Sequence, residues 1–151
     1  MKKSALTVTV GVLLILYGLV NFGAGMGQFS KAKMVSGTSS MAANLGEKAG
    51  DSAGAAKVRH EGASASSVLY LIALFILVTA VLDIVASIGL FSGNRWVFGM
   101  LILAAICGII VEIQDTAEDG FGVGKFIFFA INLLALITAF AARDERIEAP
   151  N

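Results

Sequence analysis

The sequence has few charged residues. They make up 15% of its 151 residues, against about 25% in an average soluble domain. Hydrophobic residues make up 57% and the mean hydropathy is +0.84. Too few charged side chains are available to cover a soluble particle of this size, so we expect an integral membrane protein in contact with the lipid bilayer.

Several chemistries are excluded by what the chain lacks. Eleven basic and eleven acidic residues cancel, so no positive field is available for nucleic acid. The single Cys forms neither an internal disulfide nor a cysteine metal cage, and the single His excludes multi-histidine sites. No nucleophile–base pair or phosphate-binding motif is visible, so we expect no catalytic residues and no metal centre, which favours a non-catalytic role and leaves enzymatic activity open.

Long apolar runs are what the chain has instead. A helix needs about 20 mostly apolar residues to cross the hydrocarbon core. Runs of this kind predict spanning helices at 4–26, 66–91, 95–114 and 124–142. The fold class is therefore predicted as an all-α, four-helix transmembrane bundle in a single domain, 1–151.

The first connection, 28–65, is rich in Ala, Gly and Ser and is predicted to be a long extramembrane loop. Two alternatives stay open. Met41, Leu45 and Ala49, spaced four apart, favour a short helix on the membrane or a partner. The Ala-rich stretch 53–65 also suits an extension of the second helix beyond the membrane. The loop has few large apolar residues to bury, so we expect it to dock on another surface rather than on its own bundle.

Four spans place both termini on one side of the membrane. Lys2 and Lys3 flank the first helix, and the basic residues assigned to the inner side lie on very short segments. This density predicts cytoplasmic termini.

Asp83 lies inside the second predicted helix, where a carboxylate is costly unless it is paired or neutral. It shares a helix face with Ala80 and Ser87. We expect it to face another helix and to be uncharged, hydrogen-bonded to Asn132 or a hydroxyl. It is interpreted either as a proton relay, cation site or quinone contact, or as a structural acid.

Other polar residues extend the set of candidate sites. Asn21, Asn132 and Tyr17 are predicted to hydrogen-bond inside the membrane. Three carboxylates are spaced i, i+3 and i+7 and could share one helix face: Glu112, Asp115 and Asp119. They are interpreted either as oxygen ligands for a cation or as part of a solvated acidic loop. Partner or lipid contacts are expected at five positions: Lys57, Arg59, His60, Arg95 and Trp96.

The layout resembles the DoxX-like family of small four-helix bacterial membrane proteins. The similarity lies in the length, the four helices, the long first connection, a glycine in Leu16-Tyr17-Gly18-Leu19, and the turn Ile88-Gly89-Leu90-Phe91-Ser92-Gly93-Asn94-Arg95. It implies a membrane partner of a quinone-linked redox system and supplies no catalytic residue.

Three functions are therefore weighed. The first is a non-catalytic accessory, assembly or stabilising subunit that binds other membrane protein subunits. The second is a DoxX-like component of a quinone-linked redox system. The third is a small proton or ion pathway that uses Asp83.

Overall fold

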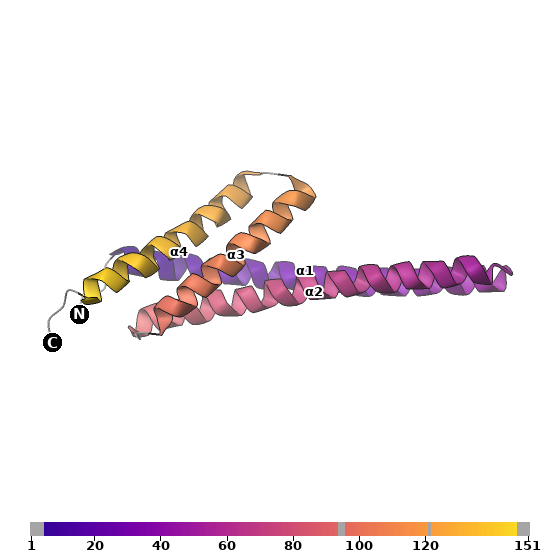
Figure 1. Ribbon diagram of the computed structural model, residues 1–151, viewed down its shortest axis with the longest axis horizontal. Helices are drawn as coiled ribbons and strands as arrows, with labels where there is room; N and C mark the ends of the chain where they lie inside the picture. The colour runs from indigo at the N-terminus through magenta and orange to yellow at the C-terminus, as the bar shows by residue number, and fades with distance from the viewer. Residues whose placement is uncertain (1–4, 94–95, 121, 148–151) are drawn as a thin grey trace. The chain divides into compact units, whose positions relative to one another are not determined.

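The computed structural model describes residues 5–93, 96–120 and 122–147, and for 115, 117–119 and 142–147 it describes the backbone alone. This part of the chain forms four helices: α1 (Ala5–Lys48), α2 (Ser52–Ser92), α3 (Val97–Asp119) and α4 (Val123–Ile147). All four are long and apolar enough to cross a membrane, over Val97–Gln114 in α3 and Val123–Ala141 in α4. The predicted all-α class with four spans is confirmed (Figure 1). The chain is a multi-pass membrane protein.

The predicted loop 28–65 is wrong, because these residues are helical. α1 has 44 residues and α2 has 41, and only a short turn around Gly50 separates them. Gly50 has φ 87°, which favours glycine. Asp51 Oδ1 then accepts a hydrogen bond of 2.9 Å from the backbone N–H of Gly54 and caps α2. The stretch 53–65 belongs to α2, as one alternative expected, and Met41 and Leu45 are helical as part of α1 rather than of a separate short helix.

The physical reason is that small side chains let two helices approach closely. The side chains buried between them include Ala32, Ala43 and Ala55, and Gly46 lies against Ala55. Alanine also has the highest helix propensity of all residues. The composition that suggested disorder therefore suits a close pair of antiparallel helices.

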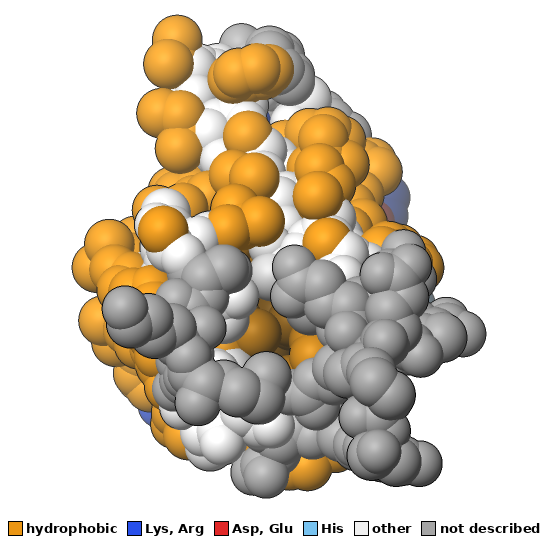
Figure 2. All heavy atoms as spheres, turned by 90° about the vertical axis from the view of Figure 1, so that its left-hand side faces the viewer, with side chains coloured by type: hydrophobic (Ala, Val, Ile, Leu, Met, Phe, Trp, Pro, Cys, Tyr) orange, Lys and Arg blue, Asp and Glu red, His pale blue; other side chains and the backbone are white. Residues whose placement is uncertain are grey.

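The chain divides into two compact units, and α1 and α2 contribute to both. The first unit contains residues 1–22 and 78–151 and forms a bundle from segments of all four helices. Its core includes Tyr17 and Leu14 of α1, Leu90 of α2, Leu101 of α3 and Ala135 of α4. Large apolar side chains such as Leu16 and Phe140 lie on the outside, as expected for a lipid-facing surface. Figure 2 shows hydrophobic side chains over much of the surface that faces the viewer.

The second unit contains residues 23–77 and is an antiparallel pair of helices. Phe29 and Tyr70 meet edge to face, with ring centroids 5.0 Å apart, and Lys33 Nζ lies 5.3 Å from the centre of the Phe29 ring. Aromatic and basic side chains gather in this way at membrane–water interfaces. We call residues 30–66 the hairpin. They follow Phe29 and precede Tyr70 in the chain, and they include all the charged residues of the second unit.

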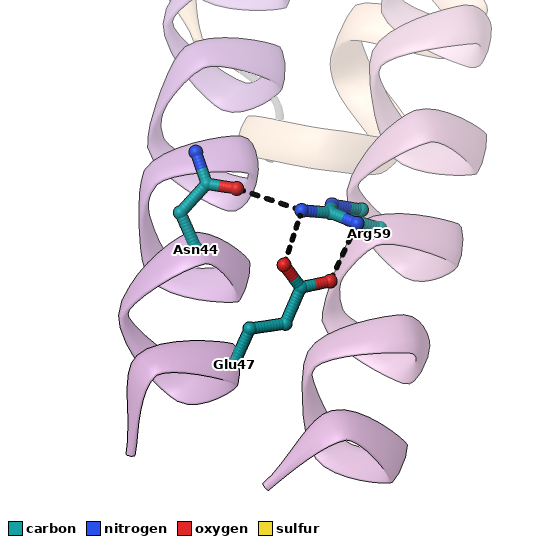
Figure 3. A network of polar contacts seen from close by, with 3 residues as sticks. All are labelled: Asn44, Glu47 and Arg59. Atoms are coloured by element: carbon teal, nitrogen blue, oxygen red, sulfur yellow. Dashed lines mark hydrogen bonds and ion pairs between the residues drawn. The ribbon is translucent and has the colours of Figure 1, made fainter. Parts of the chain in front are cut away.

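Arg59 of α2 joins the two arms of the hairpin. Its Nη1 lies 2.7 Å from Glu47 Oε1, and its Nη2 donates hydrogen bonds to Asn44 Oδ1 at 2.7 Å and Glu47 Oε2 at 3.1 Å (Figure 3). The pair is bidentate, which fixes geometry better than a single contact. The contacts hold the arms in register beside the turn.

Candidate functional site: a buried polar cluster in the bundle

Five of the buried polar side chains in the first unit gather together, and they come from all four helices. They are Tyr17 and Asn21 of α1, Asp83 of α2, Glu112 of α3 and Asn132 of α4. Each side chain lies on the inward face of its helix, about one helical turn from another buried small or apolar residue. We call these five residues the polar cluster. Buried polar groups in lipid carry a free-energy penalty unless they are bonded, so their gathering is the main chemical feature of the bundle.

The Tyr17 hydroxyl is the centre of the cluster. It donates a hydrogen bond of 3.0 Å to Glu112 Oε1, which links α1 to α3. The side chains of Asn21 and Asn132 also lie close enough to interact with this hydroxyl. The Tyr17 ring packs against Phe128 of α4, with centroids 5.1 Å apart. One side chain therefore connects three helices.

Asp83 is wholly buried in α2. As predicted, its face of the helix also carries Ala80 and Ser87, both fully buried. Ser87 Oγ donates a hydrogen bond of 2.6 Å to the carbonyl oxygen of Gly11 and fixes α2 against α1. The face is thus turned toward α1, and a Cβ added at Gly18 of α1 would lie 3.3 Å from Asp83 Cβ.

Neither carboxyl oxygen of Asp83 has a hydrogen-bond partner within the described part of the chain, so the expected bond to Asn132 is not formed. The Asn21 side chain is close enough to act on the carboxyl group, but its Nδ2 is also without a partner. Asn132 Nδ2 donates instead to the Phe128 carbonyl at 3.0 Å, within its own helix, and its Oδ1 is unpartnered. The cluster therefore contains several buried atoms that lack partners.

Glycines bring the polar side chains close to neighbouring backbones. Gly108 of α3 faces the amide of Asn132, and a Cβ at this position would lie 2.6 Å from Asn132 Cγ. Gly18 likewise faces Ala80 and Asp83. Small residues at helix interfaces allow this approach in lipid. Ala104 and Gly108, four residues apart in α3, both lie on this packed face.

The predicted cation cluster of Glu112, Asp115 and Asp119 is found only in part. Glu112 turns into the bundle toward Tyr17, whereas the side chains of Asp115 and Asp119 lie outside the described residues. Within the described ranges, no three His, Cys, Asp or Glu residues gather as a metal site. Sequence reasoning missed the Tyr17–Glu112 bond. The signal was present, because Glu112 follows Ala104 and Gly108 at steps of four and so continues their face of α3.

The residues expected to contact partners or lipid lie in different settings. Arg59 is held inside the hairpin by Glu47 and Asn44. Lys57 and His60 are exposed, and Lys57 Nζ lies 3.8 Å from Glu61 Oε1. Trp96 is half exposed, with its ring close to Gly89, and Arg95 lies outside the described residues.

Comparisons with known proteins add no relative. The chain matches no family model, no curated protein and no solved structure. Function is therefore argued from the residues themselves.

Proposed function

We propose that the protein is a non-catalytic accessory subunit of a larger membrane complex, which it assembles or stabilises by binding a partner through the hairpin. The observation that carries this proposal is the distribution of side chains on the hairpin. Its small side chains face inward, while three larger apolar residues of α1 face outward. Met34, Met41 and Leu45 are 64%, 69% and 62% exposed.

These three residues share one side of α1, because they are separated by seven and four positions. They lie in the charged part of the chain beyond Phe29, between Lys33 and Lys48, which under this proposal extends out of the bilayer. Methionine is flexible and polarizable, and it is common at surfaces that bind protein helices. A row of exposed apolar side chains on an otherwise polar helix pair supports a protein contact.

The hairpin is also long enough to reach a partner outside the bilayer. Segment 30–48 of α1 measures about 28 Å at about 1.5 Å per residue. With both termini cytoplasmic in a bacterial inner membrane, this segment lies on the periplasmic side. The orientation is supported by Lys2 and Lys3 beside the first span.

Single-cysteine labelling tests this orientation. In a Cys107→Ser background, Ser40→Cys should react with an impermeant maleimide in intact cells, and Asn151→Cys should react only after lysis. Ser40 is exposed on the hairpin, so access to the reagent depends on its side of the membrane. Labelling of Asn151→Cys but not of Ser40→Cys in intact cells would reverse the topology.

Partner binding is tested by a charge placed on the apolar row. Tagged protein is gently solubilised and its companions are quantified by mass spectrometry. Met41→Glu should lower recovery of a specific membrane protein at least about 5-fold, because a buried contact loses about 1 kcal/mol or more. Ser40→Glu adds the same charge at the neighbouring position and should leave recovery unchanged. Equal recovery with the two variants, or no companion at all, contradicts the proposal.

The same preparation separates the other two functions. A partner that reduces or oxidises quinones would favour the DoxX-like component of a redox system. Conductance of the purified chain in lipid vesicles would favour the proton or ion pathway, for which the buried carboxyl groups of Asp83 and Glu112 are the supporting observation.

A further inference from the structure

We infer that the polar cluster contains a binding site for one alkali-metal cation, with the carboxylate of Asp83 as its principal ligand. The site lies within the first unit, and it is independent of the partner contact proposed for the hairpin. Its support comes from charge, from unpartnered atoms and from the chemistry of the surrounding oxygens.

Charge comes first. A carboxylate in a spanning helix requires a compensating positive charge or a proton, because transfer of an isolated ion out of water carries a large penalty. Asp83 is wholly buried, and the described side chains provide no basic residue paired with it. The described part of the chain thus places Asp83 in the bundle without supplying a basic side chain to balance it.

A proton alone leaves the hydrogen bonding of Asp83 incomplete. Protonation converts one oxygen into an O–H donor that needs an acceptor, and the other oxygen still needs a donor. Both oxygens are without a partner. Asn21 Nδ2 provides one donor nearby, which serves at most one of the two. A cation that touches both oxygens would satisfy them together.

The neighbouring atoms are suitable ligands. Hard cations bind carboxylate, amide and hydroxyl oxygens. Asn132 Oδ1 is buried and unpartnered, and it belongs to the side-chain group around the Tyr17 hydroxyl, as does Asn21. Gly18 of α1 packs closely against Ala80 and Asp83, so the backbone of α1 lies beside the carboxylate's helix.

The charge count favours a monovalent ion over a divalent one. Glu112, the other acid of the cluster, is bonded to Tyr17, and a calcium site is usually built from several carboxylates. The described residues bring no three acidic, His or Cys side chains together. With Glu112 bonded to Tyr17, the ligands that remain are one carboxylate and neutral oxygens, a set that suits one sodium or potassium ion.

Thermal unfolding of the purified full chain in detergent tests the site. Sodium, potassium and choline chloride are compared at constant ionic strength and pH. We expect Tm to rise saturably, by at least about 3 °C, with sodium or potassium over choline, since a ligand that binds only the folded state stabilises it. Asp83→Asn should abolish the rise. Glu61→Gln removes an exposed carboxylate from the hairpin and should keep it. Equal Tm values for the wild type in all three salts overturn the inference.

A second measurement needs no variant and so does not depend on the folding of Asp83→Asn. A hydrophobic carbodiimide reacts with protonated carboxyl groups in membranes, and mass spectrometry identifies the modified residue. A bound cation displaces the proton, so sodium or potassium should slow modification of Asp83 at least about 5-fold relative to choline. Modification at the same rate in all salts assigns Asp83 to the protonated state and contradicts the site. Loss of partner recovery with Met41→Glu has no bearing on either result.

Discussion

Gly108→Ala is the most direct test of how tightly the polar cluster is packed. A Cβ at this position would lie 2.6 Å from Asn132 Cγ and closer still to Asn132 Oδ1, well inside van der Waals contact. The amide is fully buried and anchored by its bond to the Phe128 carbonyl, so it has little room to move. Either the Asn132 side chain must rotate or α3 and α4 must separate.

The magnitude follows from two opposing effects. Overpacking of this kind costs about 1–3 kcal/mol, while replacement of a helical glycine by alanine returns about 0.5–1 kcal/mol. The net loss in the free energy of unfolding is therefore about 0–2.5 kcal/mol, or up to about 10 °C in Tm. Thermal unfolding of the purified protein in detergent measures it.

Gly99→Ala is the matched control, because Gly99 is in the same helix with nothing within 4 Å of its added Cβ. It should leave Tm unchanged or raise it slightly. Combination with Asn132→Ala removes the obstructing amide, so Gly108→Ala should then become neutral, with a coupling energy of about 1 kcal/mol or more. Equal effects of Gly108→Ala and Gly99→Ala would refute the close contact between α3 and α4 at this point.

Three further results are expected. Tyr17→Phe removes the hydroxyl that bonds Glu112 and should cost about 1–3 kcal/mol in unfolding measurements, since a buried acid loses a donor; no loss of stability would show that the bond is dispensable. Arg59→Ala should cost at most about 1 kcal/mol, and less at high salt, because its ion pair with Glu47 is half exposed. Ala55→Leu, at a buried position beside the other arm, should speed amide hydrogen exchange in the hairpin, whereas Leu at the exposed position 56 should not.

The spans were predictable because an uninterrupted run of about 20 apolar residues is typical of a membrane-spanning helix. The continuation of α1 and α2 through 28–65 was not predictable, since the Ala, Gly and Ser of this segment suit both a disordered segment and a close helix pair. The difference depends on the second arm, and a single segment carries no record of what packs against it. The turn at Gly50 and the register of Ser39 against Gly62 are tertiary facts of this kind.

The polar cluster was half predictable for a related reason. Asp83, Asn21, Asn132 and Tyr17 stand out because polar residues are rare in apolar runs. Which of them form hydrogen bonds depends on how the four helices are rotated about their axes. The sequence therefore could not predict the hydrogen bond from Tyr17 to Glu112, or that Asp83 forms none with Asn132. Glu112 was grouped with its acidic neighbours in the chain, but its position on the small-residue face of α3 decided its partner.

The alanine-lined interior of the hairpin has a consequence for the apparent affinity of a partner. Buried methyl groups remove little apolar area from water, so residues such as Ala43 and Ala55 add little to the free energy that keeps the arms closed. Segments of this kind open locally well before the whole protein unfolds. A partner that recognises only the closed form binds in proportion to its population. Substitutions that strengthen the pairing of the arms should therefore raise apparent affinity without touching the contact surface.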